Sequence, residues 1–191
     1  MPTTRTPRLL VTAALSVLPV AAVLGTTTPA RAGAYAAADL DVGMPLHATA
    51  ATYGLGAGGR LGWRFNVGPA WIAPEVGGHY LAFLGTSGIY TDQPNDQVAR
   101  VFGGARFGLA GPVQPSFYGH VGAGWLGAHA VGPALDVGFA LDLALVPHFT
   151  FGAQLGYDVA LIWHGTDPTF GAFPPYVVRW INAGLHAGVA F

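Results

Sequence analysis

Hydrophobic and polar residues alternate along the segment 146–163, which reads VPHFTFGAQLGYDVALIW. From Phe151 to Trp163 every second residue is hydrophobic or aromatic, whereas the alternate positions from Thr150 to Ala160 are glycine, small or polar, with one carboxylate at Asp158. Successive side chains of a β-strand point to opposite faces, so this period of two predicts a strand. One face of that strand is apolar and the other carries little side-chain volume.

Eight runs with the same alternation divide the chain after residue 32. They cover approximately 34–47, 52–66, 70–84, 97–109, 116–129, 134–146, 150–163 and 176–191. Each run is long enough for a tilted membrane strand, which needs about 9–11 residues. We therefore predict an all-β domain over residues 33–191, folded as an eight-stranded antiparallel up-and-down transmembrane β-barrel. A membrane helix is not expected, because proline and glycine interrupt the long uncharged stretch 107–135.

The connections between the runs alternate in length. Short connections containing proline follow the second, fourth and sixth runs, whereas long ones follow the third and seventh, at 85–97 and 164–175. Outer-membrane barrels have short periplasmic turns and longer extracellular loops, so we predict that the two long loops are extracellular. Two further connections on that side, near Thr49 and Val131, are short.

Charged residues gather on one face of the predicted strands. Ten of the eleven charges in the eight runs share a face, and Arg179 lies on the other. A soluble lipocalin-like barrel would show the same alternation with its faces exchanged. Ten charges among many Gly and Ala residues would make a poor water-facing surface, but they suit a narrow lumen. We therefore predict an inward charge network of Asp39, Asp41, Arg60, Arg64, Glu75, Arg100, Arg106, Asp136, Asp142 and Asp158.

The predicted lumen is narrow and holds ten charged side chains. Charges in a poorly hydrated space need partners to offset desolvation, so we expect Arg–carboxylate pairs across the lumen. We also expect the inward glycines to make room for the long guanidinium side chains.

Aromatic residues concentrate near both ends of the apolar face. Two aromatic girdles flanking an aliphatic band match the two interfaces of a bilayer. The predicted girdle residues are Tyr53, Phe65, Tyr80, Phe107, Phe117, Trp125, Phe151 and Trp163.

Composition and charge narrow the possible partners. Only 9% of residues are charged and 52% are hydrophobic, so something other than water is expected to cover much of the surface. The formal net charge of −1 offers no electrostatic reason for a nucleic-acid partner. The absence of cysteine excludes disulfides and thiolate chemistry.

The first 32 residues have the features of a secretory signal peptide. Arg5 and Arg8 precede an apolar stretch from Leu9 to Leu24, and Ala30-Arg31-Ala32 forms a small-x-small cleavage site. An N-terminal membrane anchor is the alternative, although a sixteen-residue stretch interrupted by Pro19 is short for a spanning helix.

The chain resembles small bacterial outer-membrane β-barrels of the OmpA/OmpX type. The resemblance is carried by the eight alternating runs and by the last strand, WINAGLHAGVAF, which ends on Phe191. In that family a terminal aromatic, with a hydrophobe two residues earlier, is read by the barrel-assembly machinery, and Val189 and Phe191 match this signal. The family favours glycine five residues before the end, where this chain has His186. The resemblance implies an outer-membrane location, contact with outer-membrane lipid and lipopolysaccharide, and a monomer.

Motifs that suggest other chemistry lack the context they need. Two G-x-G-x-x-G matches lie within predicted strands, whereas a dinucleotide site needs that loop to open a helix. His79, His120 and His186 point inward from three different strands, without metal-site spacing, so we expect lumen hydrogen bonds. Ser87 and Ser116 have no activating His at a recognisable spacing. We therefore predict neither enzyme activity nor a cofactor or metal.

Two classes of function remain open. The first is a barrel whose lumen is plugged by side chains and whose loops at 85–97 and 164–175 have a structural or surface-interaction role. The second is a narrow channel for small solutes or hydrophobic molecules. Eight strands enclose a lumen just wide enough for side chains to fill, which favours the first. A lipid-modifying outer-membrane enzyme is a third, weaker alternative.

Overall fold

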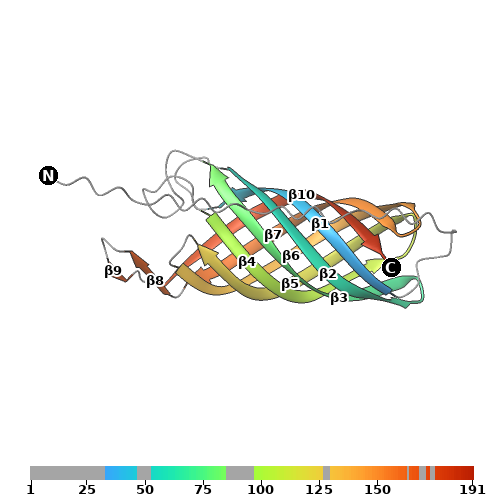
Figure 1. Cartoon of the computed structure of the whole chain (residues 1–191), viewed down its shortest axis with the longest axis horizontal. Helices are drawn as coiled ribbons and strands as arrows, with labels where there is room; N and C mark the ends of the chain where they lie inside the picture. The colour runs from blue at the N-terminus through green and yellow to red at the C-terminus, as the bar shows by residue number, and fades with distance from the viewer. Residues whose placement is uncertain are drawn as a thin grey trace.

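Eight long antiparallel strands wind around a common axis in the computed structural model (Figure 1). The structure describes residues 33–46, 53–84, 97–126, 130–162, 164–167, 171–172 and 175–191. The barrel strands are β1 (Gly33–Pro45), β2 (Tyr53–Val67), β3 (Ala70–Leu84), β4 (Gln97–Leu109), β5 (Val113–Leu126), β6 (Ala130–Val146), β7 (Phe149–Ile162) and β10 (Tyr176–Ala190). The predicted signal peptide and the loop residues 85–96 lie outside the described residues.

Hydrogen bonding closes the sheet into a barrel. Neighbouring strands pair in the order β5-β4-β3-β2-β1-β10-β7-β6, and β5 also pairs with β6. The first and last strands meet along an antiparallel seam that runs from Tyr35–Ala190 to Pro45–Trp180. The predicted fold class, an eight-stranded antiparallel up-and-down barrel, is therefore confirmed. None of the described residues forms a helix long and apolar enough to span a membrane.

Burial alternates along each strand as the sequence pattern predicts. Apolar side chains at one parity are exposed on the outside, such as Leu40, Phe117 and Val121, while the intervening side chains are buried in the lumen. A shift of one residue in any strand would exchange these two sets, so the hydrophobic pattern specifies the register.

Strands β5 and β6 begin three and four residues earlier than predicted, at Val113 and Ala130. The sequence prediction treated Pro115 as part of a turn and Val131 as part of a connection, and both assignments are wrong. Pro115 and Pro133 lie within the strands and pair with Leu141 and Ala123. Each proline is close to the beginning of its strand, where the loss of one backbone donor interrupts few ladder bonds.

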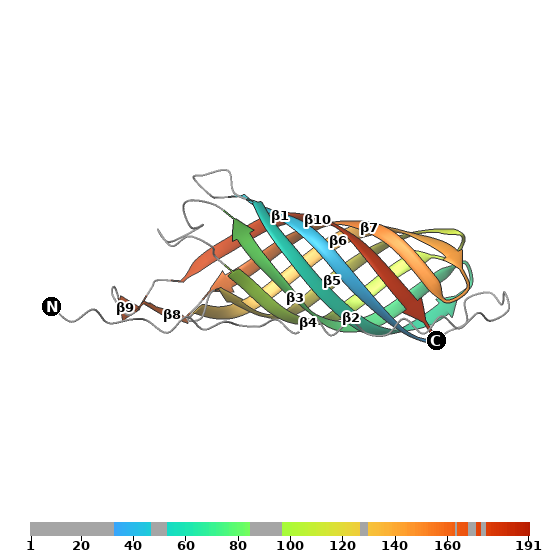
Figure 2. The same ribbon diagram turned by 45° about the horizontal axis from the view of Figure 1, so that its top comes forward.

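The short β2–β3, β4–β5 and β6–β7 turns lie at one end of the barrel (Figure 2). The C-terminus shares one end with the short turns, whereas two short strands, β8 (His164–Asp167) and β9 (Gly171–Ala172), extend beyond the other end (Figure 2). β8 continues the barrel sheet by pairing with the first residues of β6, and β9 pairs with β8. Part of the predicted long loop 164–175 is therefore an extension of the sheet.

The β6–β7 turn fastens the end of the last strand. His148 adopts a left-handed conformation with φ of 69°, and its carbonyl accepts a 2.7 Å hydrogen bond from the backbone N–H of Ala190. The ring Nδ1 of His148 also lies 2.9 Å from the Ala190 carbonyl oxygen. At the seam, the N–H of Phe191 donates to the carbonyl of Ala34 at 2.8 Å. The last two residues are thus bonded to the β6–β7 turn on one side and to β1 on the other.

Candidate functional site: the lumen

All ten charged residues predicted for the lumen point inward. Nine of them are buried and Arg64, near the short-turn end, is half-buried. Glycine, alanine and small polar residues occupy many of the neighbouring inward positions and leave space for larger inward side chains.

Three arginines bind carboxylates from other strands. Arg60 of β2 donates to Asp39 of β1, and its Nε lies 3.7 Å from Glu75 of β3. The Nε of Arg106 approaches the same Glu75 at 3.5 Å. Glu75 is therefore shared by two guanidinium groups, which surround it on the lumen side.

The third arginine reaches across the barrel. Arg100 of β4 binds Asp136 of β6 at 2.6 Å and also donates to Asp158 of β7. Asp158 is fully buried, and the Nδ2 of Asn182 donates to its second oxygen. Two carboxylates that would otherwise repel each other are thus held together by one guanidinium.

One histidine connects the arginine clusters. His120 of β5 lies between Glu75 and Asp136, with its Nε2 2.5 Å from one carboxylate and its Nδ1 2.6 Å from the other. Outside this bridge, His79 lies 2.7 Å from Asp41 and His186 lies 2.5 Å from Asp142. These aspartates were expected to bind arginine, but no arginine lies within ion-pair distance of Asp142 among the described residues.

One continuous chain of contacts passes through all eight barrel strands. In order, its members are Asp39, Arg60, Glu75, His120, Asp136, Arg100, Asp158 and Asn182, contributed by β1, β2, β3, β5, β6, β4, β7 and β10. We call this chain the lumen network. It cross-links the wall of the barrel from the inside.

Neutral side chains that the sequence analysis did not select make further contacts in the lumen. The phenol of Tyr35 donates to Glu75, and the side-chain amide of Gln154 donates to Asp41 at 3.0 Å. Near the short-turn end, Arg64 donates to Gln114 at 2.9 Å and lies over the Trp71 ring, 4.4 Å from its centroid. Strand parity places these side chains inward, so the signal was present, but only charged residues were selected.

Inward glycines accommodate rings and carboxylates, contrary to the expectation that they make room for arginine. The ring of Tyr118 lies over Gly138 of β6 and Gly156 of β7, which are neighbours in the sheet. Arg106 packs on this ring, 4.9 Å from its centroid, and His120 stacks beside it. The Tyr118 ring thus occupies the space that the two neighbouring glycines leave.

Substituting Gly138 by alanine should destabilise the barrel. The added Cβ would overlap the Tyr118 ring and lie 2.5 Å from the carbonyl oxygen of Leu155, so both ring and backbone must move. Overpacking of this kind costs about 1–3 kcal/mol. Gly119→Ala is the matched control, because a Cβ there makes only ordinary contacts at 3.9 Å. Urea unfolding in lipid vesicles measures both variants, and equal midpoints would contradict the proposed fit.

The end of the lumen opposite the short turns is apolar. Inward residues there form one buried cluster, comprising Leu81, Phe83, Val98, Leu126, Ala134, Ala160, Val178 and Trp180. We call this cluster the apolar plug. Phe83 and Trp180 meet edge to face, with ring centroids 6.4 Å apart. The distribution of charges in the sequence indicated a polar inward face along the whole barrel. The structure shows instead that this face is apolar at one end.

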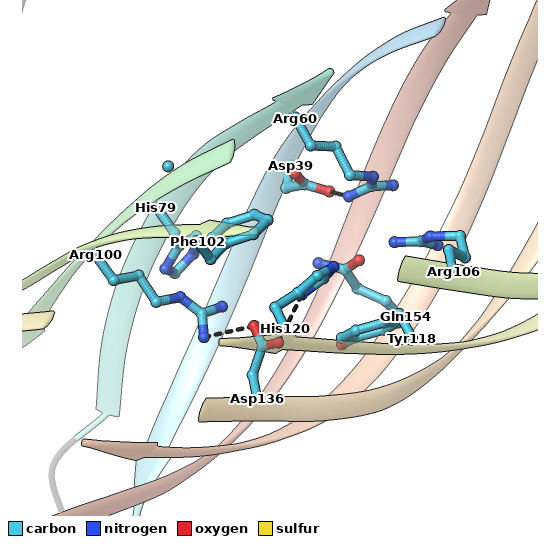
Figure 3. Close-up of a pocket in the computed structure, with 11 residues that line it drawn as sticks. Asp39, Arg60, His79, Arg100, Phe102, Arg106, Tyr118, His120, Asp136 and Gln154 are labelled. Atoms are coloured by element: carbon cyan, nitrogen blue, oxygen red, sulfur yellow. Dashed lines mark hydrogen bonds and ion pairs between the residues drawn. The ribbon is translucent and has the colours of Figure 1, made fainter. Parts of the chain in front are cut away.

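The lumen network encloses little free space. A cavity of about 20 Å³ lies among Arg60, Arg100, Arg106, His79 and Gln154 (Figure 3). This is room for about one water molecule. A drug-sized ligand needs a pocket of about 300 Å³ or more, far larger than this cavity.

The predicted girdle residues lie on the outside of the barrel wherever the structure describes them. Phe65, Phe107, Phe117 and Phe151 are exposed toward the short-turn end, and Tyr53, Tyr80 and Trp125 toward the other end. Trp163 lies outside the described residues. Of the predicted assembly residues, Phe191 is exposed and Val189 is half-buried.

The surroundings of the metal-ligating residue types and of the two serines can be stated for the described residues. They contain no group of three or more His, Cys, Asp and Glu side chains placed to hold a metal ion. Ser116 is buried in the lumen, and its hydroxyl has no hydrogen-bond partner within the described part of the chain. Ser87 lies outside the described residues. A buried serine without a base is not an activated nucleophile.

Comparison with known proteins identifies the type of fold. No family model and no curated protein matches the sequence. The structure is similar to that of Neisserial surface protein A (NspA), with a TM-score of 0.60 and 16% identity, covering 83% of this chain and 97% of NspA. Weaker similarity extends to the Yersinia pestis outer membrane protein Ail, with a TM-score of 0.41 and 16% identity, covering 83% of this chain and 99% of Ail. A de novo designed transmembrane β-barrel gives a TM-score of 0.42 and 13% identity, covering 86% of this chain and 100% of the designed one. The chain thus has the fold of a small, closed, eight-stranded outer-membrane β-barrel.

Proposed function

We propose that the protein is an integral outer-membrane barrel with a closed lumen, whose role is structural or surface-interacting. The observation that carries this proposal is the lumen network, which links all eight strands and leaves room for about one water molecule. The apolar plug adds a dry layer across the same lumen. A barrel filled in this way contributes its wall and its loops, and offers no path for solutes.

The proposed orientation follows from the two ends of the barrel. Short turns and the C-terminus mark the periplasmic end, and β8 and β9 extend from the other end toward the outside of the cell (Figure 1). Loops 85–97 and 164–175 would then form the presented surface. We further propose export through the predicted signal peptide, insertion by the barrel-assembly machinery and a monomer in the membrane.

Electrical recording in planar bilayers tests the closed lumen. The purified, refolded protein should show no steady single-channel conductance, because the charged residues are paired and the apolar plug excludes water. A water-filled general porin inserted in the same bilayers serves as the positive control. Regular conductance steps from the wild-type protein would reject the closed barrel in favour of a narrow channel.

A further inference from the structure

His120 is a buried histidine that contacts a carboxylate with each of its ring nitrogens. Its Nε2 lies 2.5 Å from Oε1 of Glu75, and its Nδ1 lies 2.6 Å from Oδ1 of Asp136. A neutral imidazole has one N–H donor and one acceptor, whereas an ionised carboxylate only accepts. Two such contacts therefore require one more proton than a neutral histidine and two carboxylates supply.

The surroundings of Glu75 favour its ionised form. Its Oε2 accepts a hydrogen bond from the phenol of Tyr35, and the Nε of Arg60 lies 3.7 Å from the same oxygen. The Nε of Arg106 lies 3.5 Å from Oε1, the oxygen that also faces His120. Because guanidinium groups stay charged and can only donate, a proton on either oxygen of Glu75 would face a donor.

Asp136 is held in a similar way. Its Oδ2 binds Arg100 at 2.6 Å, and its Oδ1 faces His120. His79 lines the same small cavity as His120 and lies 2.7 Å from Asp41, its own carboxylate. The extra proton therefore belongs on the ring of His120, where both nitrogens then donate.

Two aromatic rings beside His120 suit a positive charge. The ring centroids of Phe102 and Tyr118 lie 4.5 and 5.2 Å from that of the imidazole, and the Tyr118 ring is stacked with it (Figure 3). Aromatic faces carry partial negative charge and attract cations within about 6 Å of the ring centroid. His120 thus has carboxylates at both nitrogens and aromatic rings against its plane.

We propose that His120 is a fifth cation of the lumen, with a proton on each ring nitrogen, and that it acts as a positioning residue between the two arginine clusters. Without its charge, the buried carboxylates of Glu75 and Asp136 would repel each other across the ring. His120 is then a structural cation and not a pH sensor, because it stays charged in media where an ordinary histidine is neutral. The proposal rests on the closed barrel proposed above and names the group that joins the two halves of its lumen.

Nitrogen NMR of the refolded protein with isotope-labelled histidine reads the protonation state directly. At about pH 8.5, some two units above the ordinary histidine pKa of about 6.5, both ring nitrogens of His120 should carry a hydrogen. Contacts with the rings of Phe102 and Tyr118 assign its signals. His148 is the internal control, because it is exposed and its Nδ1 faces a single carbonyl oxygen, so it should carry one hydrogen. A single hydrogen on His120 under these conditions would overturn the proposal.

A rescue measurement tests the role of the charge. His120→Gln keeps a polar side chain but removes the cation, so the unfolding midpoint in lipid vesicles should fall. Adding Asp136→Asn removes one of the two carboxylates that the cation holds, while Arg100 keeps Asp158 as its partner. The double variant should therefore recover part of the lost midpoint.

Asp142→Asn is the matched control for the rescue. Asp142 is buried in the same lumen but is bound by His186, so its amide should not compensate for the loss of His120. Absence of recovery with Asp136→Asn, or equal recovery with both amides, would show that His120 acts through its size and hydrogen bonds alone. These measurements use the folded barrel without ion flow, so the bilayer recordings test the closed lumen separately.

Discussion

Replacing Arg100 by alanine should lower the free energy of unfolding by about 3–5 kcal/mol, the usual consequence of leaving buried charges without their partner. Among the described residues, Arg100 is the one arginine that contacts both Asp136 and Asp158, and both carboxylates are buried. Its removal leaves two neighbouring carboxylates facing each other. Denaturant unfolding of the refolded protein in lipid vesicles, followed by tryptophan fluorescence, measures the loss.

Arg64→Ala is the matched control for this prediction. Arg64 is half-buried and donates to the neutral side chains of Gln114 and Asn66, so its loss leaves no carboxylate unpaired. We expect a cost of about 1 kcal/mol, that of an ordinary hydrogen bond. Adding Asp158→Asn to Arg100→Ala should recover part of the lost stability. Equal losses for the two arginine variants would show that the lumen network does not stabilise the barrel. The apolar plug stays in place, so Arg100→Ala should remain closed in bilayer recordings.

Changing Phe191 to alanine should sharply reduce the amount of folded protein in the outer membrane of expressing cells. Phe191 matches the terminal aromatic that the assembly machinery reads in similar barrels, and its side chain is 76% exposed at the end of the seam. Alanine keeps the backbone bond to Ala34 and removes only the ring. Heat-modifiable mobility of the membrane fraction on gels measures folded protein.

Phe107→Ala is the control that distinguishes recognition of Phe191 by the assembly machinery from a simple loss of hydrophobic surface. Phe107 is a girdle residue at the same end of the barrel as Phe191 and is 54% exposed, so its loss removes a comparable outward-facing surface. We expect near-normal yield for this variant. Both purified variants should refold equally well into vesicles without any assembly factor. A similar drop in cellular yield for the two variants would assign the effect of Phe191 to lost hydrophobic area.

The sequence by itself determined the barrel and the direction of its side chains. A period of two places alternate residues on opposite faces, so charges such as Asp158 and aromatics such as Phe107 could be assigned to the lumen or the lipid without coordinates. The sequence placed the starts of two strands too late where proline occurs. Pro115 and Pro133 are typical of turns, but proline is tolerated near the start of a strand.

Only the tertiary structure decided which inward residues meet. Arg100 and Asp158 are 58 positions apart and belong to strands that are not neighbours in the sheet. Their contact depends on how the strands tilt and stagger when the sheet closes, and alternation carries no information on that stagger. The same closure places the Tyr118 ring over Gly138 and collects the apolar plug at one end. The face of the sheet on which a side chain lies is set locally within its strand. The partner that it meets across the lumen is set by how the whole barrel closes.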